Sequence, residues 1–291
     1  MPVSDQTLST LAATHDIIQL GATADEIRRA HHGVRTTFVR VADVPAETDA
    51  ASDWPGTTAE IRIVGVPPSA AAAVARVTQV AAKAGGVPLS GFSLADLEQI
   101  AAREGLTLRA LLESLRDAGL ELVAEAPFDR LDDARRSIEQ VNIAGLSLAR
   151  LTIHQLRPDI LGLYKAVADL QRNVAVLRAF APLPRVINPA VPTTGYDDVK
   201  RIALARIVVD NVPSIQVDWS RYGPKLAQVA LTVGADDLDA VSPMNETPDG
   251  RRRAPLEEVR RNIRAAGQEP VERNGRFDLV EPTLTTTPGA R

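Results

Sequence analysis

Short β-branched strands alternate with helices of roughly ten or more residues through most of the chain, and this alternation constrains the fold more than any other feature. Glu60–Val66, Leu120–Ala126 and Ser214–Trp219 have strand patterns, and each is followed by a helical pattern. The alternation indicates βαβ units and a parallel sheet. About six or seven such units favour a TIM-like (β/α) barrel over an open sheet, although periodicity alone does not separate the two.

The individual elements are predicted from periodicity and from the residues that begin and end helices. Gly33 ends the first helix, because glycine readily adopts the positive φ of a helix C-cap. Asp197 and Asp198 fall in the first turn of a long helix, where the helix dipole favours carboxylates. Helices are expected over residues 5–32, 69–84, from a Ser93 cap to Gly105, and over 107–119, 131–140, 161–172, 195–210, 224–233 and 255–266. Strands are expected over 36–41, 60–66, 120–126, within 141–148 and 174–184, and over 214–219, 235–241 and 269–272.

The same patterns divide the chain into three parts. Residues 1–58 are expected to hold N-terminal helices, one strand and, over 42–58, an aperiodic loop rich in Asp, Ala, Pro and Gly. Residues 59–280 are expected to form the barrel. Residues 281–291 are expected to be a flexible tail rich in Thr and Pro.

The charge balance and the absence of long apolar runs argue against several classes of protein. The formal net charge is −4, whereas a nucleic-acid-binding protein usually carries a basic excess. No apolar run approaches the roughly 20 residues that span a bilayer. Residues 1–10 lack the basic and apolar stretches of a secretory signal. We therefore expect a cytoplasmic protein with no nucleic-acid or membrane partner.

The chain contains no cysteine, which removes disulfides, thiol nucleophiles and thiolate-bound metals together. The histidines His15, His31, His32 and His154 are scattered, and no pair has metal-ligand spacing such as H-x-x-x-H. We expect no metal site. No G-x-S-x-G motif supports a hydrolase of the nucleophile-elbow type.

Strand-end carboxylates and aromatic residues are the candidate site. Asp237 and Asp239 are two residues apart, so they share one face of a strand. At the carboxyl end of a barrel strand they would face the mouth, as catalytic acid or base groups; the structural alternative is a cap for the following loop. Asp218, Trp219 and Tyr222 follow another strand and could bind a purine or an aromatic carboxylate, the alternative being burial in the core.

Two groups of basic residues have simpler explanations. Arg206 is a candidate ligand-binding residue, but it lies four positions before Asp210 on one helix face, and an ordinary ion pair explains that spacing. Residues 251–253 are three arginines that follow a turn. A solvated loop is the expected role, with phosphate binding as the alternative.

A long collinear series of motifs resembles one enzyme family. TTGYDDVKRIALARIVVDNVPSIQVDW (Thr193–Trp219) is similar to the family pattern T-G-x-D-D-x-x-x-x-A-x-A-R-x-x-x-D-N-x-P-x-I-x-x-x-W. The match continues through Lys225–Ala240 and Ala254–Asn274, and upstream through Ser93–Glu121 and the FAPLP of Phe180–Pro184. These residues resemble the aminofutalosine synthase group of radical-SAM enzymes, from the futalosine branch of menaquinone biosynthesis. Dehypoxanthine futalosine cyclases and deazaflavin synthases are similar relatives.

This sequence departs from the family where the resemblance places the cofactor. The family's C-x-x-x-C-x-x-C cluster loop corresponds to VADVPAETDAASDWPG (Val41–Gly56), which has no sulfur ligand for a [4Fe–4S] cluster. Its glycine-rich P-G-G-G-A-E segment corresponds to Val123–Asp129, and its E-E-x-x-x-H-M-A-G segment to Ser242–Gly250. Thr58 leads directly into the family's second strand. The resemblance therefore implies an α/β fold, a TIM-like (β/α) barrel that is partial or eroded at its N-terminal βα unit.

Three functional hypotheses follow from a retained scaffold without the cluster ligands. The first is a pseudoenzyme of menaquinone biosynthesis that binds a futalosine-like ligand or an active synthase homologue, with no cofactor. The second is a cluster-independent lyase, hydrolase or isomerase that uses the strand-end aspartates as acid and base. The third is a stable fold that has lost its role.

Overall fold

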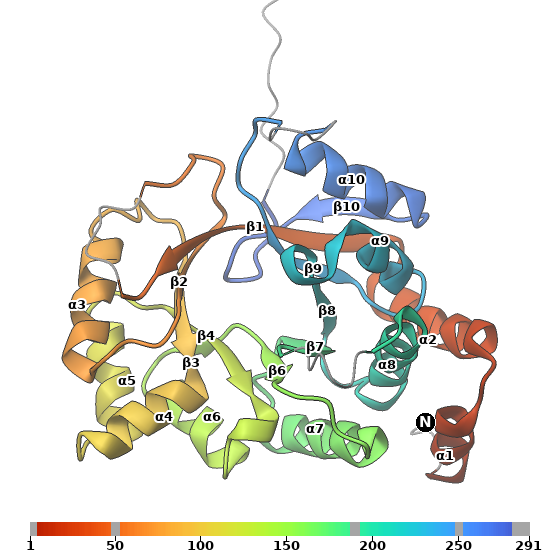
Figure 1. The fold of residues 1–291 in the computed structure, drawn as a ribbon, viewed down its shortest axis with the longest axis horizontal. Coiled ribbons are helices and arrows are strands. Elements are labelled where there is room, and N and C mark those ends of the chain that lie inside the picture. Colours follow the sequence, from red (N-terminus) through yellow and green to blue (C-terminus); the bar gives the residue numbers. More distant parts are fainter. Residues whose placement is uncertain (1–4, 48–52, 187–192, 248–252, 281–291) are drawn as a thin grey trace, which may run out of the picture.

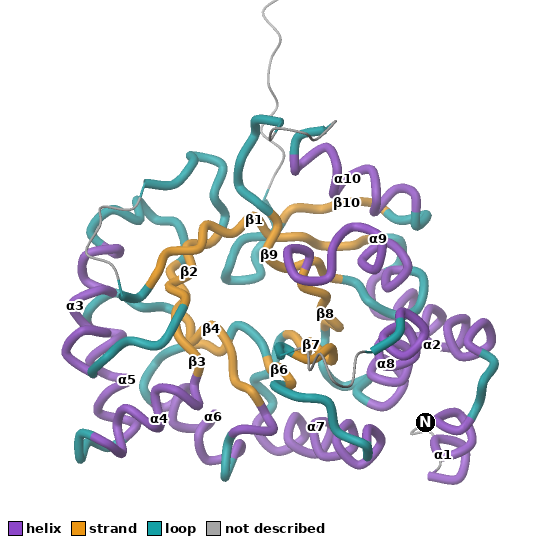
Figure 2. The backbone as a smooth tube through the Cα atoms, in the orientation of Figure 1, coloured by secondary structure: helices purple, strands orange, loops and turns teal. Residues whose placement is uncertain are grey.

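The computed structural model describes residues 5–47, 53–186, 193–247 and 253–280, and its parallel strands close into a ring (Figure 2). The last strand of the ring returns to pair with the first, through Thr37 and Asp237. The TIM-like (β/α) barrel expected from the alternation is therefore confirmed. The strands of the ring are β1 (Arg35–Pro45), β2 (Glu60–Val64), β3 (Leu89–Ser93), β4 (Leu122–Pro127), β6 (Leu151–Ile153), β7 (Ala179–Pro184), β8 (Ser214–Asp218) and β9 (Asp237–Val241).

Two short strands complete the sheet. β5 (Ser147–Leu148) pairs with the first half of β4, and β6 pairs with its second half, so β5 and β6 together occupy one position of the ring. β10 (Glu269–Glu272) pairs with the start of β1 beside the ring.

Helices surround the ring (Figure 1). Ile61 and Ile63 on β2 and Leu238 on β9 belong to the main apolar core, and the residues that alternate with them point into the barrel. The helices are α1 (Asp5–Ala13), α2 (Ile17–His32), α3 (Ala70–Ala81), α4 (Leu94–Arg103), α5 (Leu108–Asp117), α6 (Ala134–Ile143), α7 (Ile160–Val174), α8 (Gly195–Val208), α9 (Trp219–Leu231) and α10 (Pro255–Ala265), with a 3-10 turn at Phe128–Arg130. Among the described residues, none of these helices is long and apolar enough to cross a membrane.

The N-terminal βα unit has kept its strand, and its connection to the next strand is a loop. β1 pairs with β9 on one side and β2 on the other, so it is an integral part of the barrel. Between β1 and β2, residues 46–47 and 53–59 form no helix. The loop expected from residue 42 begins later, because Ala42–Pro45 extend β1 and pair with Ile61–Val64.

Two further boundaries differ from the prediction. The single helix expected over residues 5–32 is two helices, because the Asp16 carboxylate accepts hydrogen bonds from the N–H groups of Ile18 and Gln19 and starts α2. Ser93 occupies the N-cap position of α4, as expected, but its side chain makes no capping hydrogen bond.

The last described segment, residues 273–280, closes the amino-terminal end of the barrel. Arg276 pairs with Glu121 ahead of β4, at 2.5 and 2.7 Å, and the Gly275 N–H donates to the Ala59 carbonyl ahead of β2 at 3.0 Å. A Cβ at Gly275 would lie 2.9 Å from Glu60 Cγ, so only glycine fits there without movement. The expected tail, residues 281–291, lies outside the described residues.

Candidate functional site

A buried ion cluster occupies the middle of the barrel. Arg62 donates to both carboxylate oxygens of Asp239, at 2.8 and 3.0 Å, and Arg150 bonds the same carboxylate. Burial alone would raise the pKa of Asp239, but the guanidinium groups of Arg150 and Arg62 outweigh it and hold that pKa well below its usual range. Both oxygens are thus engaged by cations.

A second ion pair lies nearer the amino-terminal end. Arg273 forms a bidentate pair with Asp237, at 2.6 and 2.7 Å, and its guanidinium stacks on the Phe277 ring, 4.0 Å from the centroid. Gln216 and Thr37 donate the remaining hydrogen bonds to Asp237, at 2.6 and 2.5 Å. This carboxylate is completely buried and fully engaged.

Asp237 and Asp239 share a face, as predicted, but they lie inside the barrel and not at its mouth. β9 begins at Asp237 and ends at Val241, so neither carboxylate stands at the carboxyl end of the strand. A general base needs a free lone pair within reach of a substrate proton. The surrounding arginines therefore favour a role for these two aspartates in holding the barrel together.

The carboxyl ends of β7 and β8 carry a largely buried ion pair. Arg185 donates to Asp218 at 2.7 Å and lies 2.9 Å from Glu125 on β4. The other oxygen of Asp218 accepts from the N–H of Arg221 at 3.0 Å, so Asp218 is the N-cap of α9. Asp218 therefore lies at the mouth, as predicted, and the first turn of α9 holds its carboxylate there.

A cavity of about 420 Å³ opens beside this ion pair, at the carboxyl ends of β1, β8 and β9. Asp43 from the end of β1 lines it, together with Trp219. Ala240, also in its wall, has a φ of 56°, an uncommon backbone conformation for a residue with a Cβ and one that clusters at functional sites. The remaining wall is formed by Val41, Ser220, Gly223, Pro224, Ser242, Pro243, Arg253, Pro255 and Glu258.

Asp43 is an exposed carboxylate of this cavity, whose wall also contains the partly exposed Glu258. It has no hydrogen-bond partner among the described residues, and the structure leaves it exposed. Partial burial raises its pKa, the negative charges of Asp239 and Asp218 add to that effect, and Arg62 opposes it. The sequence pattern does not reveal Asp43, because the composition of residues 42–58 predicts a loop. The signal that would reveal it is its place two residues after Val41 on a longer β1.

The aromatic candidates lie at the same end of the barrel. Trp219 is 8% exposed and lines the cavity, so it serves both the core and the cavity wall. Tyr222 donates to the Pro184 carbonyl at 2.6 Å, and burial raises the pKa of its hydroxyl. Gly223, with a φ of 74°, breaks α9 after this first turn. Tyr222 therefore supports the mouth without lining the cavity.

Arg206 lies outside the mouth, contrary to its predicted place among the ligand-binding residues. It is completely buried on α8, donates to the Gly234 carbonyl at 2.9 Å and pairs with Asp236. The expected ion pair with Asp210 gives way to this one, because the loop before β9 brings Asp236 against α8. Arg206 therefore stabilises the packing of α8 against the barrel.

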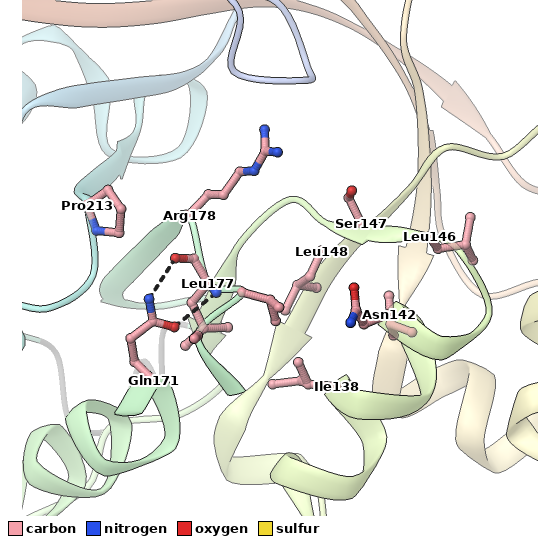
Figure 3. A pocket seen from close by; sticks show the side chains of 12 residues that line it. Ile138, Asn142, Leu146, Ser147, Leu148, Gln171, Leu177, Arg178 and Pro213 are labelled. Carbon is pink, nitrogen blue, oxygen red and sulfur yellow. Dashed lines mark hydrogen bonds between the residues drawn. The ribbon is translucent and has the colours of Figure 1, made fainter. Parts of the chain in front are cut away.

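A second cavity, of about 390 Å³, lies at the opposite end of the barrel (Figure 3). Gln171 is tied to Leu177 by a reciprocal pair of hydrogen bonds, which Figure 3 shows as dashed lines. Arg178 donates to the Arg276 carbonyl of the closing segment. These polar groups serve the fold. Among the described residues, no group of three or more His, Cys, Asp or Glu side chains could hold a metal ion.

Comparisons with known proteins agree on one group of relatives. The CofH/MqnC C-terminal region matches residues 181–285. Aminodeoxyfutalosine synthase of Thermus thermophilus is 28% identical over 237 residues, 67% of this chain and 61% of that protein. The 5-amino-6-(D-ribitylamino)uracil–L-tyrosine 4-hydroxyphenyl transferase of Methanoculleus marisnigri is 29% identical over 180 residues, 53% of this chain and 49% of that protein. The chain thus spans about half to two thirds of the length of these curated relatives.

Solved structures share the fold. Methylornithine synthase superposes with a TM-score of 0.67 at 13% identity, covering 93% of this chain and 94% of that one. The [FeFe]-hydrogenase maturase HydG gives a TM-score of 0.63 at 10% identity, covering 92% of this chain and 72% of that one. At such low identity the likeness concerns the barrel alone.

Proposed function

Since this chain is a cysteine-free, divergent homologue of the aminofutalosine synthase group of radical-SAM enzymes, we propose that it binds a futalosine-like small molecule at the mouth of its barrel and performs no cluster-dependent radical chemistry. The single observation that carries this proposal is the cavity at the ends of β1, β8 and β9, which keeps an open carboxylate and an aromatic wall on a barrel that has no thiolate.

The residues present do not fit a [4Fe–4S] cluster. The stretch from Val41 to Gly56, where the family's cluster loop would lie, offers the carboxylates of Asp43, Glu47 and Asp53 among its described residues. Carboxylates are hard oxygen donors that suit Mg²⁺ or Ca²⁺, whereas the irons of this cluster are held by thiolates. No step of the proposed function passes through the cluster.

The relatives' names suggest the ligand. Two of them are aminodeoxyfutalosine synthases, from Thermus thermophilus and Streptomyces coelicolor. A futalosine-like molecule joins an aromatic base to a hydroxylated sugar. The cavity supports both parts, because Trp219 provides an apolar surface and Asp43 and Arg253 provide polar groups beside it.

A second candidate function is a cluster-independent lyase, hydrolase or isomerase, and Asp43 favours it. The carboxylates first predicted for acid–base work, Asp237 and Asp239, are each held by buried arginines. Asp43 is accessible and its raised pKa brings it closer to neutral pH, which is what a general acid or base requires. In this form of the proposal Asp43 exchanges a proton with the ligand.

Isothermal titration of the wild-type chain with futalosine tests the proposal. We expect saturable one-to-one binding that Asp43→Ala and Arg253→Ala each weaken about tenfold, a loss of about 1.4 kcal/mol. Asp117→Ala and Arg109→Ala, at exposed positions on α5, are matched controls that should leave binding unchanged.

Two results would separate the candidates. Wild-type chain that leaves futalosine unchanged after prolonged incubation supports the binding function, whereas product formation that Asp43→Asn abolishes supports the enzyme. Absence of any heat of binding with futalosine, in protein whose thermal unfolding is cooperative, would overturn both.

A further inference from the structure

The cavity at the amino-terminal end of the barrel has an aliphatic floor (Figure 3). It measures about 390 Å³ and lies between the last turns of α6 and α7, beside β5 and the residues that lead into β7. The floor consists of buried side chains, each at most 4% exposed: Ile138, Val141, Leu146, Leu148 and Leu177. This amino-terminal cavity lies at the opposite end from the mouth, and the proposed function makes no use of it.

Hydrogen bonds fix the wall of this cavity between α7 and β7. Ala175, with a φ of 54°, ends α7 and donates its N–H to the Gln171 carbonyl at 2.8 Å. The Gln171 side chain then donates to the Leu177 carbonyl at 3.1 Å and accepts from the Leu177 N–H at 3.0 Å. The wall is therefore pre-formed, and a pre-formed cavity costs a small ligand little ordering of the protein.

Three exposed polar side chains that line the cavity have unused hydrogen-bonding groups. Arg178 donates from Nη1 to the Arg276 carbonyl, while its Nε and Nη2 groups have no acceptor in the described part of the chain. The Ser147 hydroxyl and the Asn142 amide likewise have no partner among the described residues. Figure 3 shows Arg178 and Asn142 on opposite sides of Leu148, so polar groups flank the aliphatic floor.

The charge of the cavity favours a singly charged anion. Among the residues that line it, all of them in the described part of the chain, Arg178 alone is charged. The neighbouring Glu121 carboxylate is already paired with Arg276, and the Val141 carbonyl at the end of α6 accepts from the Leu146 N–H at 3.1 Å. A carboxylate matches the two free N–H groups of one guanidinium, whereas a phosphate dianion would exceed the single cation.

We propose that the amino-terminal cavity is a second small-molecule site, which binds a carboxylate carrying a short aliphatic chain. The carboxylate accepts hydrogen bonds from Nε and Nη2 of Arg178 and from the Ser147 hydroxyl. The chain covers Leu148 and Leu177, whose apolar surface selects it over a small hydrophilic anion. The site is independent of the futalosine-like ligand proposed for the mouth.

Nuclear magnetic resonance titration of the full chain with hexanoate, hexanamide and acetate tests the inference, with the amide signals of Leu148 and Leu177 as the readout. Hexanamide keeps the aliphatic chain of hexanoate without its charge, and acetate keeps the charge without the chain. We expect hexanoate to bind saturably and about tenfold more tightly than hexanamide, because only the carboxylate makes charge-assisted hydrogen bonds to Arg178. Acetate should bind more weakly than hexanoate, because it covers little of the apolar floor.

Variants of two nearby arginines separate a specific contact from a general charge effect. Arg178→Gln should reduce the affinity for hexanoate to that for hexanamide, whereas Arg178→Lys should keep a preference for hexanoate because it keeps the cation. Arg172→Gln is the matched control. It removes the same charge from an exposed position on α7, where Arg172 pairs with Asp169 outside the cavity, and it should leave the affinity for hexanoate unchanged.

Asn142→Phe provides a second test that does not depend on the folding of the Arg178 variants, because it places a ring in the cavity from an exposed position. It should abolish hexanoate binding. Equal affinity for hexanoate and hexanamide, a preference that survives Arg178→Gln, or no saturable shift in folded wild-type protein would overturn the inference. Shifts confined to the mouth, near Trp219, would also overturn it. The proposed function is tested separately, by futalosine binding at the other end of the barrel.

Discussion

Arg62 on β2 and Asp239 on β9 are joined by two hydrogen bonds, of 2.8 and 3.0 Å, across β1, the strand that lies between theirs in the ring. The two residues are 177 positions apart in the chain. Arg150 holds the same carboxylate from the other side of the barrel. The barrel is thus fastened internally at the place where its first and last strands meet.

Asp239→Ala is expected to destabilise the protein strongly. It leaves Arg150 buried without its carboxylate partner and leaves Arg62 paired with Glu60 alone, and breaking a buried ion pair costs about 3–5 kcal/mol. Urea denaturation followed by circular dichroism measures the change. Asp117→Ala, at a surface ion pair, should change the free energy of unfolding by less than about 1 kcal/mol. If the two variants change the free energy of unfolding by similar amounts, the buried ion pairs of Asp239 contribute little to stability.

The acid stability of the fold should depend on Asp239. Its pKa is depressed in the folded state by Arg150 and Arg62, so its contribution is fully present above the unfolded pKa of about 4. That contribution is lost as the pH falls through the folded pKa. The stability difference between wild type and Asp239→Asn should therefore be largest at neutral pH and shrink in strong acid. A pH-independent difference would contradict this origin.

Asp43→Asn should have the opposite pH dependence. Partial burial raises the pKa of Asp43 in the folded state, so its charged form opposes folding, and the penalty grows as the pH rises above the unfolded pKa. The substitution should stabilise the protein by a few tenths of a kcal/mol at pH 7 and have no effect near pH 3. Thermal melts of both proteins across this range measure it, and destabilisation at pH 7 would refute the assignment.

Arg206→Ala should lower stability without a specific effect on the ligand. The buried carboxylate of Asp236 would lose its arginine partner and keep the Ile215 N–H and the His32 ring, at a cost of up to about 3–5 kcal/mol. The folded fraction should bind futalosine as tightly as wild type, because Arg206 lies between α8 and the barrel and not at the mouth. Calorimetry below the variant's melting temperature tests this. A weaker affinity of the folded variant for futalosine would show that Arg206 contributes to ligand binding.

Gly275→Ala should loosen the segment that closes the amino-terminal end of the barrel. The new Cβ would lie 2.9 Å from Glu60 Cγ and 3.1 Å from Pro88 Cβ. Overpacking of this kind costs about 1–3 kcal/mol. Gly56→Ala is the control, because no atom lies within 4 Å of its added Cβ. Equal stability of the two variants, measured by denaturant unfolding, would show that the contact is easily relieved.

The barrel could be predicted because its evidence in the sequence is local. Strand and helix periodicities such as those around Glu60–Val66 repeat along the chain, and a parallel sheet follows from their order. The break at Asp16 was missed because a capping carboxylate looks like any polar residue of a helix surface. β3 was missed because its residues, LSGFS, are mostly small and polar.

The sequence pattern predicts the position of Asp218 and Trp219 at the end of a strand, but it does not predict the buried charges. Alternating residues such as Glu60 and Arg62 give β2 the pattern of a strand with one solvent-facing side. Only closure of the ring places them inside, where Arg62 meets Asp239. Such pairings between distant segments leave no periodic signal in one sequence, and the same holds for the exposure of Asp43.

The most direct test of the proposed function is the difference electron density of crystals grown with saturating futalosine. We expect density for the ligand at the mouth, in the cavity beside Asp43 and Trp219. Density confined to the cavity at the opposite end, near Gln171 and Arg178, would contradict it, as would an empty mouth at a futalosine concentration that saturates the protein in solution.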